Sequence, residues 1–297
     1  MNPLAILTAD LHLRDDQPIC RTDNFFETQA RKLNWLYRLQ EKLNCPIFDA
    51  GDLFHKGRPS HFLMQWAIDA RMPVEFFTIP GNHDLPSHNI ELLESSGLGV
   101  LDAARAVCVL TREYTFEKSG IFIHAFPWGE KPAPMKEPGK EKHTIAICHI
   151  MTYQGEKPWP GCSDPSAEEL LEQMQGYDLV LTGHNHKTFV VEKDGRLLVN
   201  PGSFTRQTSD QTDHQPRVFL WYGGTNIEQV FIPIEEGVIT REHINKVEDR
   251  EERMSAFVEK LTGEMEIGLS FEQNLEEFFS KNKVRKPVKD MVWEALK

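Results

Sequence analysis

With 297 residues and 40% hydrophobic content, the chain can bury a sizeable core, either as one large α/β domain or as one domain with a small appendage. Its net charge of −12 argues against a protein that grips polyanions by bulk charge. A polyanionic substrate stays open, because bound divalent cations are missing from that count. Five cysteines without a CxxC motif do not suit a disulfide framework, so we expect a reducing, cytoplasmic compartment.

Five short apolar runs are each followed at once by polar residues of metal-ligating type. They are LAILTAD, CPIFDAGD, EFFTIPGNHD, TIAICHI and DLVLTGHNH. Each run is typical of a buried strand, with its polar cluster where the strand ends. The first run lacks a preceding basic segment and stops at Asp10, so we expect a strand there and neither a signal peptide nor a membrane span.

Three helical patterns lie between these strands. Their apolar positions are Leu33, Leu36, Tyr37, Leu39 and Leu43, then Leu63, Trp66, Ala67 and Ala70, then Ala167, Leu170, Leu171 and Met174. Alternating strands and helices predict an α/β fold whose ligands bind beyond the carboxyl ends of the strands. The five polar clusters should therefore converge on one cleft.

The pattern changes after residue 186 to alternating strands joined by the turn dipeptides Asp194-Gly195 and Gly223-Gly224, which predict an antiparallel extension. Charged helical segments follow, one near 247–262, one opening at a Ser270 and Gln273 capping box, and one near Pro287. We therefore expect a domain over 1–238 and a helical extension over 239–297. The segment 130–143 is expected to be a surface loop.

The polar clusters contain nine residues suited to metal ligation or proton transfer. They are Asp10, His12, Asp52, Asn82, His83, Asp84, His149, His184 and His186. Taken singly, several have ordinary structural roles, such as a turn or a core histidine, but their joint occurrence favours a site. Oxygen and nitrogen donors without thiolate suit manganese, iron or zinc. The set exceeds one tetrahedral ion and predicts two divalent ions bridged by a carboxylate. Histidines 61, 88, 124, 143, 214 and 243 fit no such pattern, and we expect His124 to be structural.

The order D-x-H, GD, GNHD, H, GHxH resembles the calcineurin-like metallophosphoesterase superfamily over about residues 1–235. That resemblance implies a four-layer α/β/β/α sandwich, here with a small helical C-terminal extension. It also implies a first metal held by Asp10, His12, Asp52 and His186, and a second held by Asp52, Asn82, His149 and His184, with Asp52 as the bridge. His83 would lie over the phosphate and Asp84 would orient its imidazole.

The segment GDLFHKGRPS, residues 51–60, lacks the GDxVDRG pattern of protein phosphatases and is similar to SbcD-type nuclease subunits of double-strand-break repair complexes. This similarity implies a second catalytic imidazole at His55, a DNA nuclease using Mn²⁺ (or Fe²⁺ or Zn²⁺), a homodimer built through helices, and an SbcC-type coiled-coil ATPase partner. The helix after Ser60 could form the dimer surface or pack on the sheet. An apolar C-terminal face, Phe271, Leu275, Phe278 and Phe279, could dock on the ATPase or pack on its own domain.

Two features depart from that nuclease family. The C-terminal region is shorter than usual, and the turn after D-x-H is replaced by HLRDDQPICRTDNFF, so compact versions such as those encoded by phages are most similar. The alternative is a small-molecule phosphodiesterase or nucleotide pyrophosphatase, which the acidic net charge favours mildly. A scaffold that lost its metals is disfavoured, because all nine positions carry competent residues.

Overall fold

The computed structural model describes residues 2–70, 72–73, 75–116, 120–135, 142–242, 244, 250–251, 253–255 and 270–295. The chain divides into two compact units, Met1–Thr240 and Arg241–Lys297. All five cysteines are free thiols. No helix in the described ranges is long and apolar enough to cross a membrane.

The first sheet of the larger unit has six strands in the order β12-β11-β1-β2-β3-β4. These are β1 Ala5–Thr8, β2 Ile47–Asp49, β3 Phe76–Thr78, β4 Cys108–Val109, β11 Arg217–Gly223 and β12 Asn226–Phe231. Strands β1 to β4 are parallel, whereas β11 pairs antiparallel with both β1 and β12. The helices of this half are α1 Phe25–Leu43, α2 His61–Asp69 and α3 Gly97–Ala103, with short 3₁₀ segments at Pro86–His88 and Ile90–Ser95.

The second sheet also has six strands, in the order β5-β6-β7-β8-β10-β9. These are β5 Glu113–Phe116, β6 Ile121–Phe126, β7 His143–His149, β8 Leu179–Gly183, β9 Phe189–Lys193 and β10 Arg196–Asn200. Its four central strands are parallel, and the edge strands β5 and β9 are antiparallel. Helix α4 Ala167–Gln173 belongs to this half, and a 3₁₀ turn at Ser209–Gln211 precedes β11.

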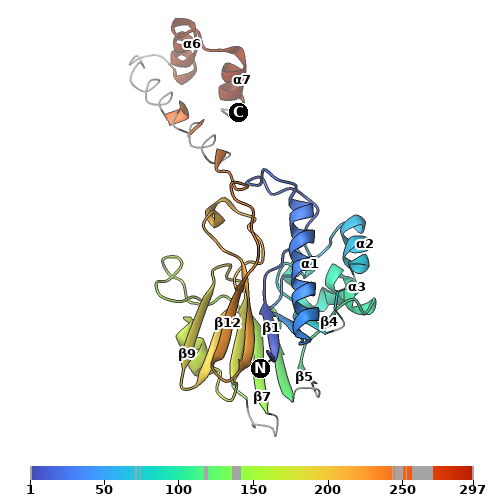
Figure 1. The fold of residues 1–297 in the computed structure, drawn as a ribbon. Coiled ribbons are helices and arrows are strands. Elements are labelled where there is room, and N and C mark those ends of the chain that lie inside the picture. Colours follow the sequence, from blue (N-terminus) through green and yellow to red (C-terminus); the bar gives the residue numbers. More distant parts are fainter. Residues whose placement is uncertain are drawn as a thin grey trace. The chain divides into compact units, whose positions relative to one another are not determined.

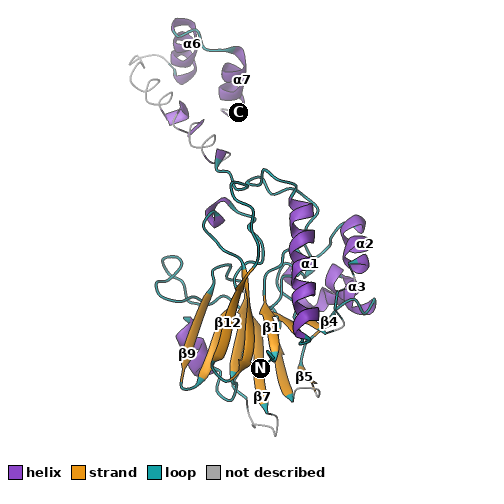
Figure 2. Ribbon diagram, in the orientation of Figure 1, coloured by secondary structure: helices purple, strands orange, loops and turns teal. Residues whose placement is uncertain are grey.

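Three apolar clusters hold these layers together. One lies between the sheets and joins inward side chains such as Leu7 and Phe48 to Ile145 and Leu181. A second packs the other face of the first sheet on α1, α2 and α3, and a third packs the second sheet on α4. The predicted four-layer α/β/β/α sandwich is confirmed, with helices outside and strands inside (Figures 1 and 2). The five predicted strands are present as β1, β2, β3, β7 and β8, divided between the two sheets.

The smaller unit contains α6 Phe271–Lys281 and α7 Lys286–Ala295. Ser270 caps α6 with the predicted capping box to Gln273. Leu275, Phe278 and Phe279 are buried against side chains that include Trp293, so this face of α6 packs on α7 within its own unit. Most of the predicted helix over 247–262 lies outside the described residues.

Candidate metal centre

The loops that leave β1, β2 and β3 place six of the nine predicted residues side by side. Asp10 and His12 follow β1, Asp52 follows β2, and Asn82, His83 and Asp84 follow β3. Backbone hydrogen bonds join the first two loops, from Asp10 N to Gly51 O at 3.0 Å and from His12 N to Asp52 O at 2.8 Å. His149 ends β7, and His184 and His186 follow β8 of the second sheet. The carboxyl ends of strands from both sheets therefore meet here.

Left-handed backbone marks these loops. Asp10, His12, Asp52 and His184 have φ of 53°, 47°, 57° and 86°. Such conformations are uncommon outside glycine and cost on the order of 1–3 kcal/mol each. Gly81 shows how closely the loops approach, because a Cβ there would lie 2.2 Å from Asp52 Oδ1. Strain of this kind persists only where the surroundings fix it, and it concentrates at functional sites.

A first group of donors joins Asp10, His12 and His186, whose ligand atoms lie within 4.8 Å of one another. Nε2 of His12 and Nε2 of His186 are 3.0 Å apart. Asp10 is fully buried and accepts hydrogen bonds from the backbone N–H of His184 at 3.0 and 3.2 Å. Burial raises the pKa of the Asp10 carboxyl and lowers that of His12 well below its ordinary value, so His12 is a neutral imidazole with a lone pair to offer.

A second group joins Asp52, His149 and His184, together with the amide of Asn82. Asn82 Oδ1 is 3.0 Å from His149 Nε2 and 2.9 Å from His184 Nδ1. Asp52 Oδ2 lies 3.4 Å from His149 Nε2 and 3.6 Å from His12 Nε2. The carboxylate of Asp52 is thus within reach of both groups, which is the position that a bridging ligand requires.

The charges within the second group suit a cation. Burial alone would lower the pKa of His149, but the nearby Asp52 carboxylate raises it to about 9. Burial would likewise raise the pKa of Asp52, yet His149 holds it well below the usual range. Burial, with a contribution from His149, lowers the pKa of His184 to about 4. The centre therefore stabilises positive charge beside Asp52, and His12 and His184 are neutral imidazoles with lone pairs to offer. Its donors thus fit two divalent ions.

His55 and His83 form a pair beside the first group. Their rings stack with centroids 5.5 Å apart and planes 20° apart, and ligand atoms of both lie within 4.8 Å of His12. Nδ1 of His83 lies 2.9 Å from the carbonyl oxygen of His55. Burial, with help from Arg14 and His83, lowers the pKa of His55 to about 4, so its imidazole is neutral at neutral pH. Both side chains are half-buried and line a cleft.

The role predicted for Asp84 needs correction. Its carboxylate accepts hydrogen bonds from backbone N–H groups, those of Phe54 at 2.8 Å, Gly81 at 2.9 Å and Leu53 at 3.3 Å. The partner of the His83 ring is instead the carbonyl oxygen of His55. Asp84 therefore ties the β2 and β3 loops together and positions both indirectly. Burial and the Asp52 charge raise its pKa to about 7.

The cleft beside the histidine pair has a volume of about 490 Å³. The exposed cations Lys56 and Arg58 line it together with His88. His88 was excluded by the sequence pattern, but its ring centroid lies 6.2 Å from that of His83. A short 3₁₀ segment with positive φ at Ser87 and His88 places it there, and the sequence carries no periodic signal for such a turn.

A second side chain that the sequence pattern missed is Trp128. It follows β6, whose strand end contributes no predicted ligand, and its indole lies against the imidazoles of His184 and His149. His124, expected to be structural, lies on β6 with Nδ1 2.7 Å from the hydroxyl of Tyr177.

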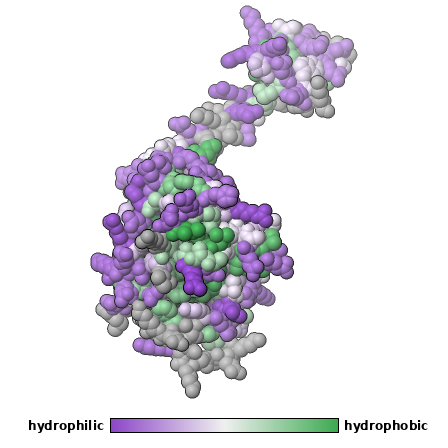
Figure 3. Space-filling view, turned by 90° about the vertical axis from the view of Figure 1, so that its right-hand side faces the viewer, coloured by the Kyte–Doolittle hydropathy of each residue, from purple (hydrophilic) through white to green (hydrophobic). Residues whose placement is uncertain are grey.

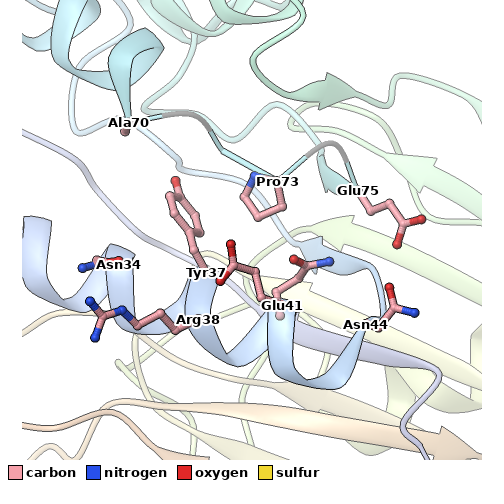
Figure 4. A pocket seen from close by; sticks show the side chains of 9 residues that line it. Asn34, Tyr37, Arg38, Glu41, Asn44, Ala70, Pro73 and Glu75 are labelled. Carbon is pink, nitrogen blue, oxygen red and sulfur yellow. The ribbon is translucent and has the colours of Figure 1, made fainter.

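Another cavity, of about 500 Å³, lies between the second half of α1 and the segment before β3 (Figure 4). Tyr37, Arg38 and Glu41 line it from α1, and Pro73 and Glu75 from the opposite side. Because Glu75 directly precedes β3, this cavity is at the amino ends of the strands, whereas the predicted ligands follow their carboxyl ends. None of the predicted site residues lines it.

One protein family matches most of the chain. Residues 5–218 match the family model described as the calcineurin-like phosphoesterase superfamily domain. No curated protein matches the chain.

The solved structures that the chain matches are distant in sequence. An archaeal phosphodiesterase is 14% identical, with a TM-score of 0.39 and coverage of 76% of this chain and 98% of its own. A Thermus thermophilus protein is 12% identical, with a TM-score of 0.48 and coverage of 78% and 100%. A Staphylococcus aureus protein provisionally named a 5′-nucleotidase is 12% identical, with a TM-score of 0.46 and coverage of 84% of this chain. This chain spans 58% of the length of that last protein. Since the family model covers most of the chain, the protein belongs to the calcineurin-like phosphoesterase superfamily and is a metal-dependent phosphoester hydrolase.

Proposed function

We propose that the chain uses two divalent ions to hydrolyse phosphodiesters, with small nucleotide diesters as the first candidate substrates. The observation that carries this proposal is the position of Asp52 between two donor groups, beside the stacked pair of His55 and His83. When bound, two divalent ions supply Lewis acidity, which activates a water and neutralises charge on the transferring phosphate. Mn²⁺ is the first ion to test, followed by Fe²⁺ and Zn²⁺.

The two histidines have different tasks in this proposal. A carbonyl oxygen can only accept a hydrogen bond, so Nδ1 of His83 carries the proton that faces His55 O. That leaves Nε2 of His83 as the nitrogen that exchanges a proton with the phosphate or its leaving oxygen. His55 is neutral at neutral pH, so its imidazole keeps one N–H that can donate to a phosphate oxygen and position the substrate, and it does not serve as the acid. Asp84 holds both loops in register.

The size of the cleft supports a small substrate. Its volume of about 490 Å³ lies within the range typical of small-ligand sites, roughly 300–1,000 Å³. The net charge of −12 also disfavours broad contact with a polyanion. The second candidate is a DNA exonuclease or endonuclease of the SbcD type. Lys56 and Arg58 support it, since both line the cleft and could contact neighbouring phosphates.

The test is Mn²⁺-dependent hydrolysis of a thymidine phosphodiester beside end-labelled single-stranded and duplex DNA. We expect His83→Ala and His55→Ala to lower kcat by about 10²-fold or more while retaining their metals, as for loss of a proton-transfer or positioning group. The matched control is His61→Ala, an exposed histidine at the start of α2. Hydrolysis of the diester alone supports the first candidate, and degradation of DNA supports the second. If His55→Ala is as active as wild type on every substrate, the role of His55 is wrong.

Partners form a separate proposal. Apolar side chains gather on the face that carries α2 and α3 (Figure 3), where Phe62, Ile68 and Val100 are 58%, 40% and 46% exposed. We propose that this face joins two copies of the chain. Phe62→Glu should then shift the sedimentation coefficient from dimer to monomer, and a wild-type monomer would refute the proposal.

The C-terminal unit is proposed to contact a coiled-coil ATPase. Because Leu275 and Phe278 pack within this unit, the surface for a partner would be formed by exposed side chains such as Phe271 and Met291. Equal capture of the ATPase coiled coil by wild type and by a Phe271→Glu, Met291→Glu double variant would contradict this.

A further inference from the structure

Trp128 lies in a tight turn that is fixed to one of the loops after β1, β2, β3 and β8, which carry predicted metal ligands and are called the metal-ligand loops. The N–H of Glu130 donates to Pro127 O at 3.0 Å, and Gly129 has φ of +87°, so residues 127–130 match a type II turn with Trp128 at its second position. A Cβ on Gly129 would meet nothing within 4 Å, so the glycine is required for its backbone angle. The N–H of Trp128 donates to Pro80 O at 2.9 Å, two residues before Asn82. The backbone that carries the indole is therefore held at a defined place beside the centre.

The surroundings of this indole differ from those of a core tryptophan. Trp221 is fully buried in the cluster between the sheets, and its Nε1–H donates to Gly224 O at 2.9 Å. Trp128 is half-buried and belongs to none of the four apolar clusters formed by described residues. Its ring centroid lies 5.1 Å from that of His184, with planes 37° apart, and 6.1 Å from that of His149. A large aromatic surface is thus held beside donors of the second group and remains partly open to solvent.

The histidine pair and the indole contact different parts of the centre. His83 contacts His12 of the first group, with ring centroids 4.8 Å apart, whereas Trp128 contacts His184 and His149 of the second. A phosphate held by both groups would therefore have imidazoles near one side and an indole near the other. Aromatic side chains stack on nucleobases regardless of base identity, because every base has a π-face.

We propose that Trp128 is a specificity-determining residue that stacks on the nucleobase of a nucleoside-bearing diester. The proposal rests on the proposed phosphodiesterase function and names its substrate class. If the indole only shielded or oriented His184, its removal would lower the hydrolysis of all diesters equally. The two roles can therefore be separated with substrates that differ in one group.

The experiment compares two diesters that share a leaving group, thymidine 5′-(p-nitrophenyl phosphate) and methyl p-nitrophenyl phosphate, with the full chain in Mn²⁺. For Trp128→Ala we expect kcat/KM on the thymidine ester to fall roughly 5- to 100-fold, mainly through KM, which is the range for losing one base–aromatic stack. The fall in kcat/KM on the methyl ester should be several-fold smaller, because that ester has no base to stack, so the ratio of the two kcat/KM values should change. Trp128→Phe should restore most of the loss. Trp159→Ala, an exposed tryptophan, is the matched control.

A binding measurement without turnover completes the test. Stacking quenches 2-aminopurine fluorescence, so 2-aminopurine deoxyriboside 5′-monophosphate should be quenched by wild type and much less by Trp128→Ala. Equal losses on both esters, or equal quenching by both proteins, would overturn the role of Trp128 and leave the phosphodiesterase proposal intact. Hydrolysis of neither ester by wild type would overturn the proposed function instead, and the quenching experiment would still decide whether Trp128 binds a base.

Discussion

The metal-ligand loops and the C-terminal helix pair follow opposite rules. In α6, local sequence and fold agree: Ser270 caps the helix, Gln273 completes the capping box, and apolar residues occupy the face that packs on α7. In the loops after β1, β2 and β8, Asp10, Asp52 and His184 adopt left-handed backbone that such residues rarely use. Agreement between local sequence preference and the observed backbone is typical of structural elements. Backbone conformations that disagree with local preference are typical of functional sites.

Burial shows the same contrast. The helix pair buries Leu275, Phe278 and Phe279, which gain from leaving water. The loops bury carboxylates and imidazoles, with Asp10 0% exposed and His149 2% exposed, which costs free energy unless each charge is paired. A bound cation would offset that cost in the loops and would do nothing for the helix pair. Three predictions sharpen this comparison.

The largest effect is expected from Asp52→Asn. An amide in place of the carboxylate removes the negative charge shared by both donor groups, so we expect loss of at least one bound ion per chain and a fall in diester hydrolysis of at least about 10²–10³-fold, the size of effect found when an electrostatic group is removed from a site. Elemental analysis of dialysed protein gives the metal content. Asp69→Asn, an exposed carboxylate on α2, should change neither quantity. Retention of both ions by Asp52→Asn would refute the bridging role.

A medium effect is expected from pH on the metal-free chain. The pKa of His149 is about 9 in the folded state and about 6.5 when unfolded, so its contribution to stability is fully present below pH 6.5 and is lost as pH rises toward 9. The pKa of His184 is about 4 when folded, so stability is also lost as pH falls from 6.5 toward 4. Above pH 6.5 the His149 contribution decides the profile, and we therefore expect Tm to drop by about 5 °C or more between pH 6.5 and pH 9.

His149→Gln provides the control for this pH profile. It removes the imidazole that titrates beside Asp52, so the decline in Tm above pH 6.5 should become smaller. The dependence of Tm on pH below 6.5 should stay as in wild type. Saturating Mn²⁺ should reverse the wild-type decline, because a bound metal replaces the proton on His149 and binding strengthens as pH rises. A wild-type Tm that is constant between pH 6.5 and 9 would contradict the assigned pKa.

The two regions also differ in how far the sequence could predict them. Strand ends and helix faces follow periodic patterns, and the five predicted strands and the capping box at Ser270 were found from periodicity and cap chemistry alone. Which side chains meet at the metal centre depends on how the two sheets pack together, and no local sequence pattern predicts that packing. The hydrogen bonds of Asp84 were therefore misassigned. Trp128 and His88 were missed because single residues in turns carry no period.

The smallest effect is expected from Ser270→Ala in the helix pair. The hydroxyl of Ser270 accepts from the N–H of Gln273 at 3.2 Å, and Gln273 Oε1 accepts from the N–H of Ser270 at 3.0 Å. Losing this cap should cost about 1 kcal/mol, measured as faster hydrogen exchange at the α6 amides. Ser280→Ala, a change at an exposed serine within the same helix, is the matched control. Diester hydrolysis should be unchanged in both variants, because the metal-ligand loops and α6 belong to separate compact units. A loss of diester hydrolysis in Ser270→Ala but not in Ser280→Ala would show that the two regions are energetically coupled and unfold as one cooperative structure.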